Sequence, residues 1–548
     1  MNSGKLYLIS GSLGVLSHLT IFIKGEWDTH APDLARCFVF WPVVLFSLLT
    51  VLGYGHAVRK SALALLSYDA GIWLSMIIYR WFYHHLRHFP GPALARVSAL
   101  WSLRRVARDA KWHINVQELH KQYGNFVRIK PREISINDAS AIKEIYGVGT
   151  SCTKGVFYDL NYPHRSLQMC RDKAFHSRRR RVWDHGFNSG ALTGYEPFIR
   201  EHCDDLIERI SSQTGEPLSI NDVIDGFAWD AMGILAFGKS FGMVKGNSHP
   251  MLDALRAAKK SGAFILTATW MLIMARNLPV INTAAAKWLA WCAEMLEERR
   301  KMGLSRKDLF SYLIAEPPWG TDNSLKVTDG DLVIESELAI GAGSQTTAST
   351  INAFLFLLAK HPETYRKLQE EIDSVLPPDA PLSHSALTGQ PYLDGCINEV
   401  MRLYPAVTSG VPRETGPRGL TIDGVFIPAY TTVSVPTYTV QRDPRNYQHP
   451  DAFIPERWLD RPELVIRKEA FIPFSTGPYS CAGKSFAMME IRLAIATIVR
   501  NFEFRLPPGL EKESLDTLDG TGVQDCFIMV VPSYDLIFTK RNLSSTSV

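Results

Sequence analysis

The residues of this chain best suited to chemistry surround Cys481, in the segment Phe474-Ser-Thr-Gly-Pro-Tyr-Ser-Cys-Ala-Gly483. A cysteine that binds a metal must be ionised, and its sulfur must be shielded and held by backbone N–H groups. Gly477 and Gly483 permit tight turns and a close approach of the backbone to a flat cofactor. A helix is predicted over Lys484–Val499, so the sulfur would precede a helix N-terminus, where negative charge is favoured. We therefore predict that Cys481 is a thiolate ligand, shielded by the phenylalanine that opens the segment.

The remaining cysteines and the overall charge exclude several other classes of protein. No C-x-x-C pair occurs, and the other seven cysteines are widely spread: Cys37, Cys152, Cys170, Cys203, Cys292, Cys396 and Cys526. This spacing predicts neither a zinc site nor a disulfide framework, and we interpret these residues as buried thiols in a reducing compartment. The 548-residue chain has a net charge of only +4. That excess is too small to indicate nucleic-acid binding, and no nucleic acid is expected as a partner.

A second candidate site lies within Leu338–Lys360, a long apolar segment that is predicted to form a buried helix. It contains the sequence Ala342-Gly-Ser-Gln-Thr-Thr347. Glycine is a poor helix former, so Gly341 and Gly343 suggest that another group approaches the helix backbone closely. The hydroxyl of Thr346 can donate to the carbonyl four residues earlier and open the helix locally, which would create a polar notch where oxygen could bind. The alternative is a face of small residues at which two helices pack.

Two groups of charged residues complete the candidate site. Glu399 and Arg402 are spaced i, i+3 within the apolar run Cys396–Leu403, so they can pair on one helix face. Exposed pairs of this kind contribute little, but loss of one partner from a buried pair costs several kcal/mol. Arg178–Arg181 form a run of four arginines within the predicted helix His176–Phe187. Such a run usually forms a solvated face, yet the apolar residues of this helix allow one face to be buried.

These ordered motifs resemble those of the cytochrome P-450 superfamily, the haem-thiolate monooxygenases. The spacing F-x-x-G-x-x-x-C-x-G resembles the haem-binding loop of that family. The resemblance implies that Cys481 is the axial ligand of the iron of haem b, with Phe474, Gly477 and Gly483 beside the cofactor. The family usually has an arginine, which pairs with a haem propionate, where this chain has Tyr479. A tyrosine hydroxyl can donate a hydrogen bond there, but only as a neutral group.

The segment of the long helix resembles the oxygen-activation motif of the family, A-G-x-D/E-T-T. The resemblance implies that Ala342 and Gly343 lie beside the cofactor and that Thr346 and Gln345 occupy the catalytic positions. An amide cannot relay protons as the usual carboxylate does, so Gln345 departs from the pattern. Water or another group would have to deliver protons if the usual oxygen chemistry runs here. A reaction that does not insert oxygen therefore stays open.

Further matches imply supporting roles for charged residues. The segment Pro455-Glu-Arg-Trp458 resembles the one whose arginine completes a buried structural triad, here Glu399, Arg402 and Arg457. The arginine-rich helix resembles the W-x-x-x-R helix of the family, with His176 in the place of the tryptophan and Arg180 in the place of the arginine. These two residues and Arg413 are expected to contact haem propionates. The remaining arginines of the run, Arg178, Arg179 and Arg181, could meet an acidic redox partner.

The first 88 residues are predicted to form a membrane anchor. Three apolar stretches, 6–23, 37–54 and 62–83, are each near the length that spans a bilayer. The alternative is one or two spans with an interfacial helix. Phe89-Pro-Gly-Pro92 cannot continue a helix, so residues 89–92 are expected to form a hinge before a haem-thiolate catalytic domain at 93–548. Arginines after the third stretch favour a cytosolic catalytic domain, although Arg59 and Lys60 would then lie on the far side.

The expected fold class is mainly α with minor β (α+β), the cytochrome P-450 fold. The resemblance implies a monooxygenase that inserts one atom of O2 into a hydrophobic small molecule, such as a terpenoid, alkaloid or polyketide of fungal secondary metabolism. No dinucleotide fingerprint or flavin domain is evident, so electrons from NADPH would come through a separate cytochrome reductase, with cytochrome b5 as a further candidate donor. The expected location is the endoplasmic reticulum membrane, in contact with lipid. Two alternatives are a haem-thiolate isomerase, dehydratase or peroxide-driven enzyme, and a non-enzymatic haem-binding protein.

The substrate is expected to meet the regions 151–170 and 251–296, by the same resemblance. Within the second region, Phe264–Ile281 is strongly apolar, with Trp270, Met271 and Met274. This segment is interpreted either as ordinary core or as a greasy substrate entrance that dips into the membrane.

Overall fold

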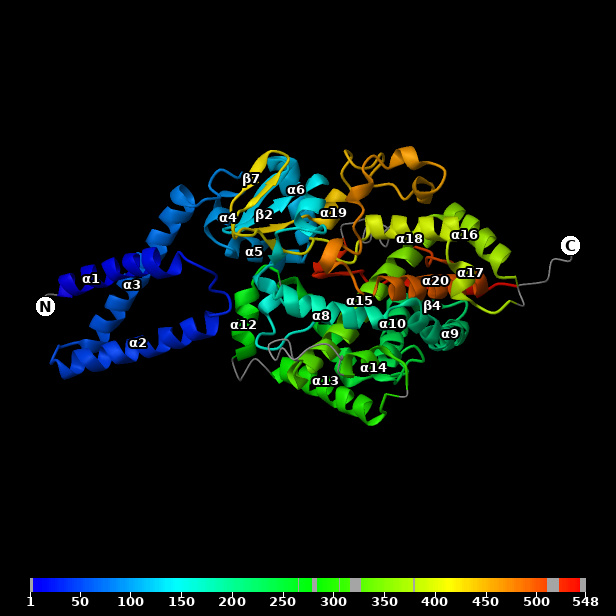
Figure 1. Ribbon diagram of the computed structural model, residues 1–548, viewed down its shortest axis with the longest axis horizontal. Helices are drawn as coiled ribbons and strands as arrows, with labels where there is room; N and C mark the ends of the chain where they lie inside the picture. The colour runs from blue at the N-terminus through cyan, green and yellow to red at the C-terminus, as the bar shows by residue number, and fades with distance from the viewer. Residues whose placement is uncertain are drawn as a thin grey trace.

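The computed structural model describes residues 3–264, 266–277, 283–304, 306–315, 327–377, 380–509 and 522–542. Figure 1 shows three long helices that extend at the N-terminal end from a larger body of helices and small sheets. The described strands form four small sheets, of five, three, two and two strands. The expected mainly helical class with minor β structure is therefore confirmed.

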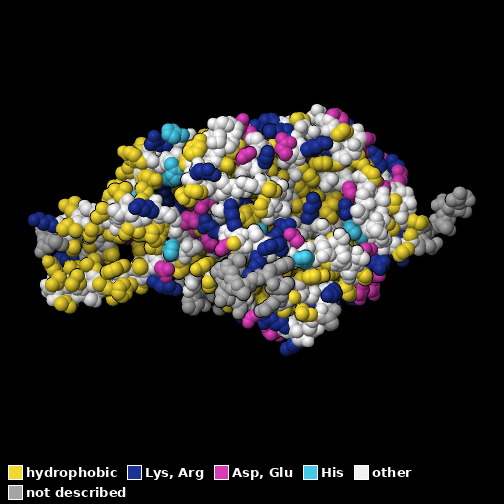
Figure 2. All heavy atoms as spheres, viewed as in Figure 1, with side chains coloured by type: hydrophobic (Ala, Val, Ile, Leu, Met, Phe, Trp, Pro, Cys, Tyr) yellow, Lys and Arg dark blue, Asp and Glu magenta, His cyan; other side chains and the backbone are white. Residues whose placement is uncertain are grey.

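The N-terminal extension consists of α1 (Ser3–Ser17), α2 (Ala31–Val51) and α3 (Ala57–Ile78). Short π-helical turns continue α1 to Phe22 and α3 to Tyr83, and all three helices are long and apolar enough to cross a membrane. Most of their large apolar side chains are exposed, and Figure 2 shows apolar side chains covering much of this extension. The three expected apolar helices are thus present, and each begins three to six residues before the stretch that apolarity alone marked.

Two glycines bring α1 and α3 into backbone contact. A Cβ atom at Gly14 would lie 2.0 Å from the carbonyl oxygen of Tyr68, and one at Gly71 would lie 2.1 Å from that of Gly11. In lipid, helix association depends on such close packing of small residues, because apolar burial against lipid provides no drive. The glycines therefore make the two helices a packed pair.

The segment after the extension is fixed against the first strand of the body, β1 (Phe126–Lys130). The backbone N–H of Arg128 donates to the carbonyl of Pro90 over 2.7 Å. Gly91 has a φ of 152°, and a Cβ atom there would lie 2.4 Å from the carbonyl oxygen of Arg128. Only glycine allows this approach. The expected division of the chain at residues 89–92 stays a prediction.

The largest sheet has the order β1-β2-β8-β5-β3. The strand β2 (Glu133–Ile136) pairs antiparallel with β1 and parallel with β8 (Thr432–Ser434). At the far edge, the two-residue strands β5 (Arg413–Glu414) and β3 (Thr153–Lys154) pair antiparallel. The other strands are β4 (Pro217–Ser219), β6 (Leu420–Ile422), β7 (Val425–Ile427), β9 (Phe502–Arg505), β10 (Gln524–Cys526), β11 (Ile528–Val530) and β12 (Asp535–Lys540).

The centre of the body is α15 (Asp329–Lys360), whose residues from Ile351 to Leu358 are all buried. The predicted helix at 338–360 is confirmed, but it begins nine residues earlier. Thr328 and Asp331 form a capping box, which satisfies the free N–H groups of the first turn. The helix ends before Pro362, which begins α16 and cannot donate a backbone hydrogen bond to α15.

The other helices of the body surround α15 on several sides (Figure 1). They are α4 (Ala93–Val97), α5 (Leu100–Asp109), α6 (Trp112–Tyr123), α7 (Ser140–Tyr146), α8 (Lys173–Gly186), α9 (Ser189–Ser211), α10 (Ile220–Phe237), α11 (Pro250–Ala258), α12 (Thr269–Asn277), α13 (Thr283–Lys301), α14 (Leu309–Ile314), α16 (Pro362–Val375), α17 (His384–Leu387), α18 (Pro391–Leu403), α19 (Thr437–Val440) and α20 (Lys484–Asn501).

Candidate active site

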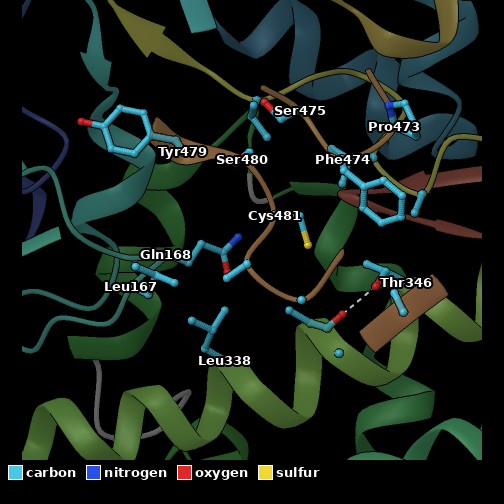
Figure 3. Close-up of a pocket in the computed structure, with 18 of the residues that line it drawn as sticks. Leu167, Gln168, Leu338, Thr346, Pro473, Phe474, Ser475, Tyr479, Ser480 and Cys481 are labelled. Carbon is cyan, nitrogen blue, oxygen red and sulfur yellow. Dashed lines mark hydrogen bonds between the residues drawn. The ribbon is translucent and has the colours of Figure 1, made fainter. Parts of the chain in front are cut away.

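A cavity of about 310 Å³ lies between α15 and the loop that precedes α20. Figure 3 shows the sulfur of Cys481 pointing into it from the loop, with Phe474 beside the sulfur and α15 across the space. Most of the wall is apolar, and its basic groups gather at one side, which we call the polar side. The structure therefore brings the predicted thiolate and the predicted helix segment to opposite walls of one cavity.

The loop holds Cys481 just before the N-terminus of α20, as the sequence predicts. Its backbone N–H donates to the carbonyl of Phe474 over 2.9 Å. The surrounding protein raises the pKa of the Cys481 thiol, whereas the backbone N–H of Gly483 and the nearby cations Arg180 and Lys484 lower it. The sulfur is nevertheless exposed to the cavity. The loop thus presents the sulfur to the cavity and supplies it with a backbone donor.

The two glycines of this loop, Gly477 and Gly483, are required for different physical reasons. Gly477 has a φ of 69°, and a Cβ atom there would lie 2.0 Å from the carbonyl oxygen of Tyr146, at the end of α7. Protein packing therefore requires it, and it is not among the described residues that line the cavity. Gly483 lines the cavity, and a Cβ atom there would meet only Phe187, at an ordinary 3.8 Å. The space that Gly483 leaves free belongs to the cavity.

The wall opposite the sulfur is formed by one face of α15. Ala342, Gly343 and Thr346 all line the cavity, and the hydroxyl of Thr346 donates to the carbonyl of Ala342 over 2.7 Å (Figure 3). The expected local opening of the helix does not occur, because α15 runs unbroken from Asp329 to Lys360. A hydroxyl can share a carbonyl that already accepts a helical hydrogen bond.

Two other residues of the predicted motif have different surroundings. A Cβ atom at Gly343 would lie 2.5 Å from the sulfur of Met232 on α10, so close helix packing accounts for this glycine. Gln345 is not among the described residues that line the cavity. Its expected catalytic role stays a prediction.

Four basic side chains gather at the polar side of the cavity. His176, Arg180 and Arg413 line it as expected, and Lys154 lies with them. Lys154 and Arg413 are 3% and 2% exposed. Each places its charge 5.0 Å from the ring centre of Tyr479, and the ring of His176 meets that of Tyr479 at 4.6 Å.

Two cations of this cluster, Lys154 and Arg413, form no ion pair with a carboxylate in the described part of the chain. Lys154 donates to the carbonyls of Leu167 and Gln168 over 2.8 and 2.7 Å, and Arg413 donates to the hydroxyl of Tyr158 over 3.0 Å. Burial, with a contribution from Arg413, lowers the pKa of Lys154 to about 7. Burial, with Lys154 next, lowers that of His176 to about 3. Buried like charges are costly unless an anion joins them, so this side of the cavity is suited to bind carboxylates.

Two arginines of the α8 run, Arg179 and Arg180, face the interior and the cavity respectively, whereas Arg181 is exposed. Arg180 pairs with Asp184 over 2.7 Å and donates to the carbonyl of Ser480 over 2.5 Å, so it also holds the cysteine loop. Arg179 is 2% exposed and pairs with the buried Glu335 of α15 over 2.8 Å. The expectation that Arg179 could meet a redox partner is therefore wrong. Arg179 and Trp183 are spaced i, i+4, and Trp183 also donates to Glu335. This spacing was the signal in the sequence for a buried helix face.

The structural triad expected from the sequence comes together behind the cavity. Glu399 accepts from Arg402 over 2.9 and 2.8 Å and from Arg457 over 2.8 Å. The backbone N–H of Ile454 and the indole of Trp458 donate to the same carboxylate, over 3.0 and 2.9 Å. The three charged side chains are fully buried. Their remaining donors reach backbone carbonyls of the segment 441–464, so the triad fastens that segment to α18.

Two charged residues of the cavity wall, Lys154 and Glu490, were not singled out from the sequence, although Lys154 lies within the region 151–170 that was expected to meet the substrate. Lys154 stands in a strand of two residues, which is too short for its pattern to reveal a buried face. Glu490 is a buried carboxyl on α20, hydrogen-bonded by Thr347 over 3.4 Å, and burial raises its pKa well above the usual range. Its other oxygen has no hydrogen-bond partner among the residues that the structure describes. A lone glutamate inside the apolar helix 484–501 was the signal for it.

Comparisons with known proteins agree with this arrangement. The cytochrome P-450 family model matches residues 90–527. The chain is 45% identical over 534 residues to the cytochrome P-450 monooxygenase nodW of Hypoxylon pulicicidum, covering 97% of this chain and 98% of the relative. It is 31% identical over 558 residues to tryprostatin B 6-hydroxylase of Aspergillus fumigatus, covering 97% and 96%.

This chain belongs to the cytochrome P-450 family. Its fold resembles the crystal structure of the cytochrome P450DA haem domain, with a TM-score of 0.69, 19% sequence identity and coverage of 80% of this chain and 95% of that one. The relatives are named as monooxygenases, and the chain is accordingly a cytochrome P-450 monooxygenase, an enzyme class that uses O2 and a redox partner on small molecules.

The family implies haem with a cysteine thiolate ligand, and the residues of this P-450 fit that group. The sulfur of Cys481 faces the cavity, and Gly483 leaves space beside it. The buried cations Lys154 and Arg413 have no carboxylate partner in an ion pair within the described chain, and Nε of Arg413 lacks any hydrogen-bond partner there. Two propionates would supply the missing negative charge.

Proposed function

We propose that this P-450 holds haem b through the thiolate of Cys481 and inserts one atom of O2 into a hydrophobic small molecule of fungal secondary metabolism. The supporting observation is the sulfur of Cys481 on one wall of an apolar cavity whose polar side carries buried cations without carboxylates. Bound there, haem would supply the iron chemistry that activates oxygen. Lys154, Arg413 and His176 would bind the propionates, with the hydroxyl of Tyr479 as a neutral donor and Arg180 supporting the loop.

Thr346 is the residue we assign to the oxygen-binding side. Its hydroxyl donates to the carbonyl of Ala342, so its lone pairs stay available to accept a hydrogen bond from water in the cavity. Burial raises the pKa of Glu490 well above its usual range, which favours a protonated carboxyl at the cavity wall. The wall thus contains one carboxyl despite the amide at Gln345.

The cavity favours an apolar substrate with at least one hydrogen-bonding group. Its walls include Leu167, Leu338 and Met401, and the amide of Gln168 faces the space in Figure 3. An apolar wall with few polar groups fixes the orientation of a ligand through those groups. A terpenoid, alkaloid or polyketide fits this description. One relative over nearly the whole chain is named tryprostatin B 6-hydroxylase, after the hydroxylation of a small molecule.

The substrate would enter from the membrane beside α12. This helix lies against α2, and Met274 and Asn277 share a hollow of about 500 Å³ with Val39 and Phe40. The side chain of Met271 is 42% exposed. Residues 265 and 278–281 of the expected entrance lie outside the described residues. We propose that residues 1–88 anchor the enzyme, that residues 89–92 join the anchor to the catalytic domain at 93–548, and that this domain faces the cytosol at the endoplasmic reticulum.

Electrons would come from NADPH through a separate cytochrome reductase, with cytochrome b5 as a second donor. The test is to purify the full chain with reductase and NADPH, and to profile metabolites of cells with and without it. Product formation should require the reductase, and Cys481→Ala should abolish the red-shifted absorption of the reduced carbon monoxide complex. Turnover without reductase would contradict the proposal and indicate an isomerase, dehydratase or peroxide-driven enzyme. Thiolate spectra without turnover of any oxidisable substrate would indicate a haem-binding protein.

A further inference from the structure

The connection between the first two helices of the extension contacts the body of the enzyme. It runs over Lys24–His30, and Figure 1 shows it reaching the body from the ends of α1 and α2. The carboxylate of Glu26 lies 2.6 Å from the guanidinium of Arg171, and both side chains are 22% exposed. The guanidinium of Arg132 donates to the carbonyl of Gly25. The connection is thus held by charged groups of the body.

Arg171 joins Glu26 to three other segments. It pairs with Asp159 over 3.0 Å and with Glu414 over 3.1 Å. Its Nε also donates to the backbone carbonyl of Lys154 over 3.0 Å. Glu414 belongs to β5 and Lys154 to β3. Arg171 therefore binds both strands of the antiparallel pair β3 and β5, on the side away from the cavity.

The same strand pair carries the cations of the cavity on its inner side. Lys154 pairs in register with Arg413, and Thr153 with Glu414. Because successive side chains of a strand point to opposite faces, Arg413 faces the cavity while Glu414 faces Arg171. A pair of two-residue strands has little stability of its own. The position of its inward cations therefore depends on the groups that hold its outer side.

The protonation states of Glu414 and Glu26 are compatible with their shared contact with Arg171. Burial, together with the neighbouring Glu26, raises the pKa of Glu414 to about 7. Burial alone would raise the pKa of Glu26, but hydrogen bonds with Glu414 and Arg171 leave it lowered. Glu26 is therefore ionised near neutral pH, and a partly protonated Glu414 can lie beside it.

We propose that Glu26, acting through Arg171, positions Lys154 and Arg413 toward the haem propionates, so that the connection between the first two anchor helices is part of the cofactor site. Glu26 does not touch the cofactor and is a positioning residue. The inference rests on the proposed function, because it assigns propionates to this cation cluster. It also gives the extension a task beyond holding the enzyme at a membrane.

The test compares Glu26→Gln with a matched control, Glu118→Gln. Glu118 pairs with Lys121 over 2.7 Å on an exposed face of α6, and neither residue lines the cavity. Full-length enzyme in lipid discs is mixed with a haem-accepting apoprotein, and haem transfer is followed by absorbance. The control should lose haem at the wild-type rate. Glu26→Gln should lose it about fivefold to tenfold faster, as for loss of one partly buried charge-assisted hydrogen bond.

A second variant separates positioning from general stability. Because Glu26 is proposed to position both Lys154 and Arg413, adding Glu26→Gln to Lys154→Gln should accelerate haem loss by less than Glu26→Gln does alone. Glu26→Asp, which keeps the charge, should restore part of the retention. Equal rates for Glu26→Gln and Glu118→Gln, or fully additive effects in the double variant, would overturn the inference. Failure of the proposed function would appear instead in the wild type, as absent haem or absent turnover.

Discussion

Lys154→Met should have opposite effects on the haem-free and haem-bound enzyme. In the haem-free protein, burial and Arg413 lower the pKa of Lys154 from 10.5 to about 7. At about 1.4 kcal/mol per pH unit, this difference corresponds to about 5 kcal/mol against the charged side chain. Methionine fills a similar volume without a charge. The variant should therefore melt at a higher temperature than wild type when haem is absent, yet release haem faster when it is present.

The pH dependence of haem retention follows from the same shift. A propionate beside Lys154 restores its charge, so haem binding takes up a proton above about pH 7. Because the haem-free pKa is about 7, wild-type affinity should fall about thirtyfold between about pH 6 and 8.5. The contribution of Lys154 to the stability of the haem-free protein should rise over the same range, because the pKa of Lys154 is lower in the folded than in the unfolded protein. Lys154→Met should flatten both trends.

The assay combines haem transfer at several pH values with thermal unfolding of the haem-free protein. Lys121→Met, at an exposed pair on α6, serves as the control and should match wild type in both. A haem-free Lys154→Met protein less stable than wild type, or a variant that keeps the full pH dependence of haem loss, would refute the reasoning. Either result would mean that Lys154 is not a destabilising buried cation that a haem carboxylate neutralises.

Three further predictions concern folding. Glu399→Ala leaves two fully buried guanidinium groups without their carboxylate and should lower the free energy of unfolding by about 3–5 kcal/mol. The loss should be seen as a lower yield of folded, haem-containing protein. A melting temperature near that of wild type would contradict a structural triad. Gly343→Ala should destabilise the protein by about 1–3 kcal/mol, because the added methyl group would clash with Met232. Gly341→Ala meets no atom within 4 Å and should stabilise the helix by up to about 1 kcal/mol. Thermal unfolding of the two variants should therefore give shifts of opposite sign. Glu490→Gln should be more stable than wild type, and the difference in the free energy of unfolding should grow as the pH rises above 4.5. The reason is that the Glu490 carboxyl ionises in that range only in the unfolded protein. A difference that does not change with pH would show that Glu490 is already ionised in the folded protein.

The sequence by itself determined the family, the ligand-bearing loop and the helices around it. Cys481 with its spaced glycines, the long apolar helix and the pair Glu399 and Arg402 are local patterns, and each depends on residues within a few turns of one another. Such patterns specify elements strongly because helix periodicity and backbone requirements act over short distances. The three apolar helices of the extension were readable for the same reason.

Only the tertiary structure decided which charges share a site. Lys154 and Arg413 meet because two-residue strands far apart in the sequence pair in register, and no local pattern reveals that partnership. The burial of Arg179 and the contact of Glu26 with Arg171 likewise depend on how distant elements pack. Charge, burial and pKa depend on the surroundings from every element at once. The sequence therefore identifies the sulfur, and the fold determines the charged groups placed around its cofactor.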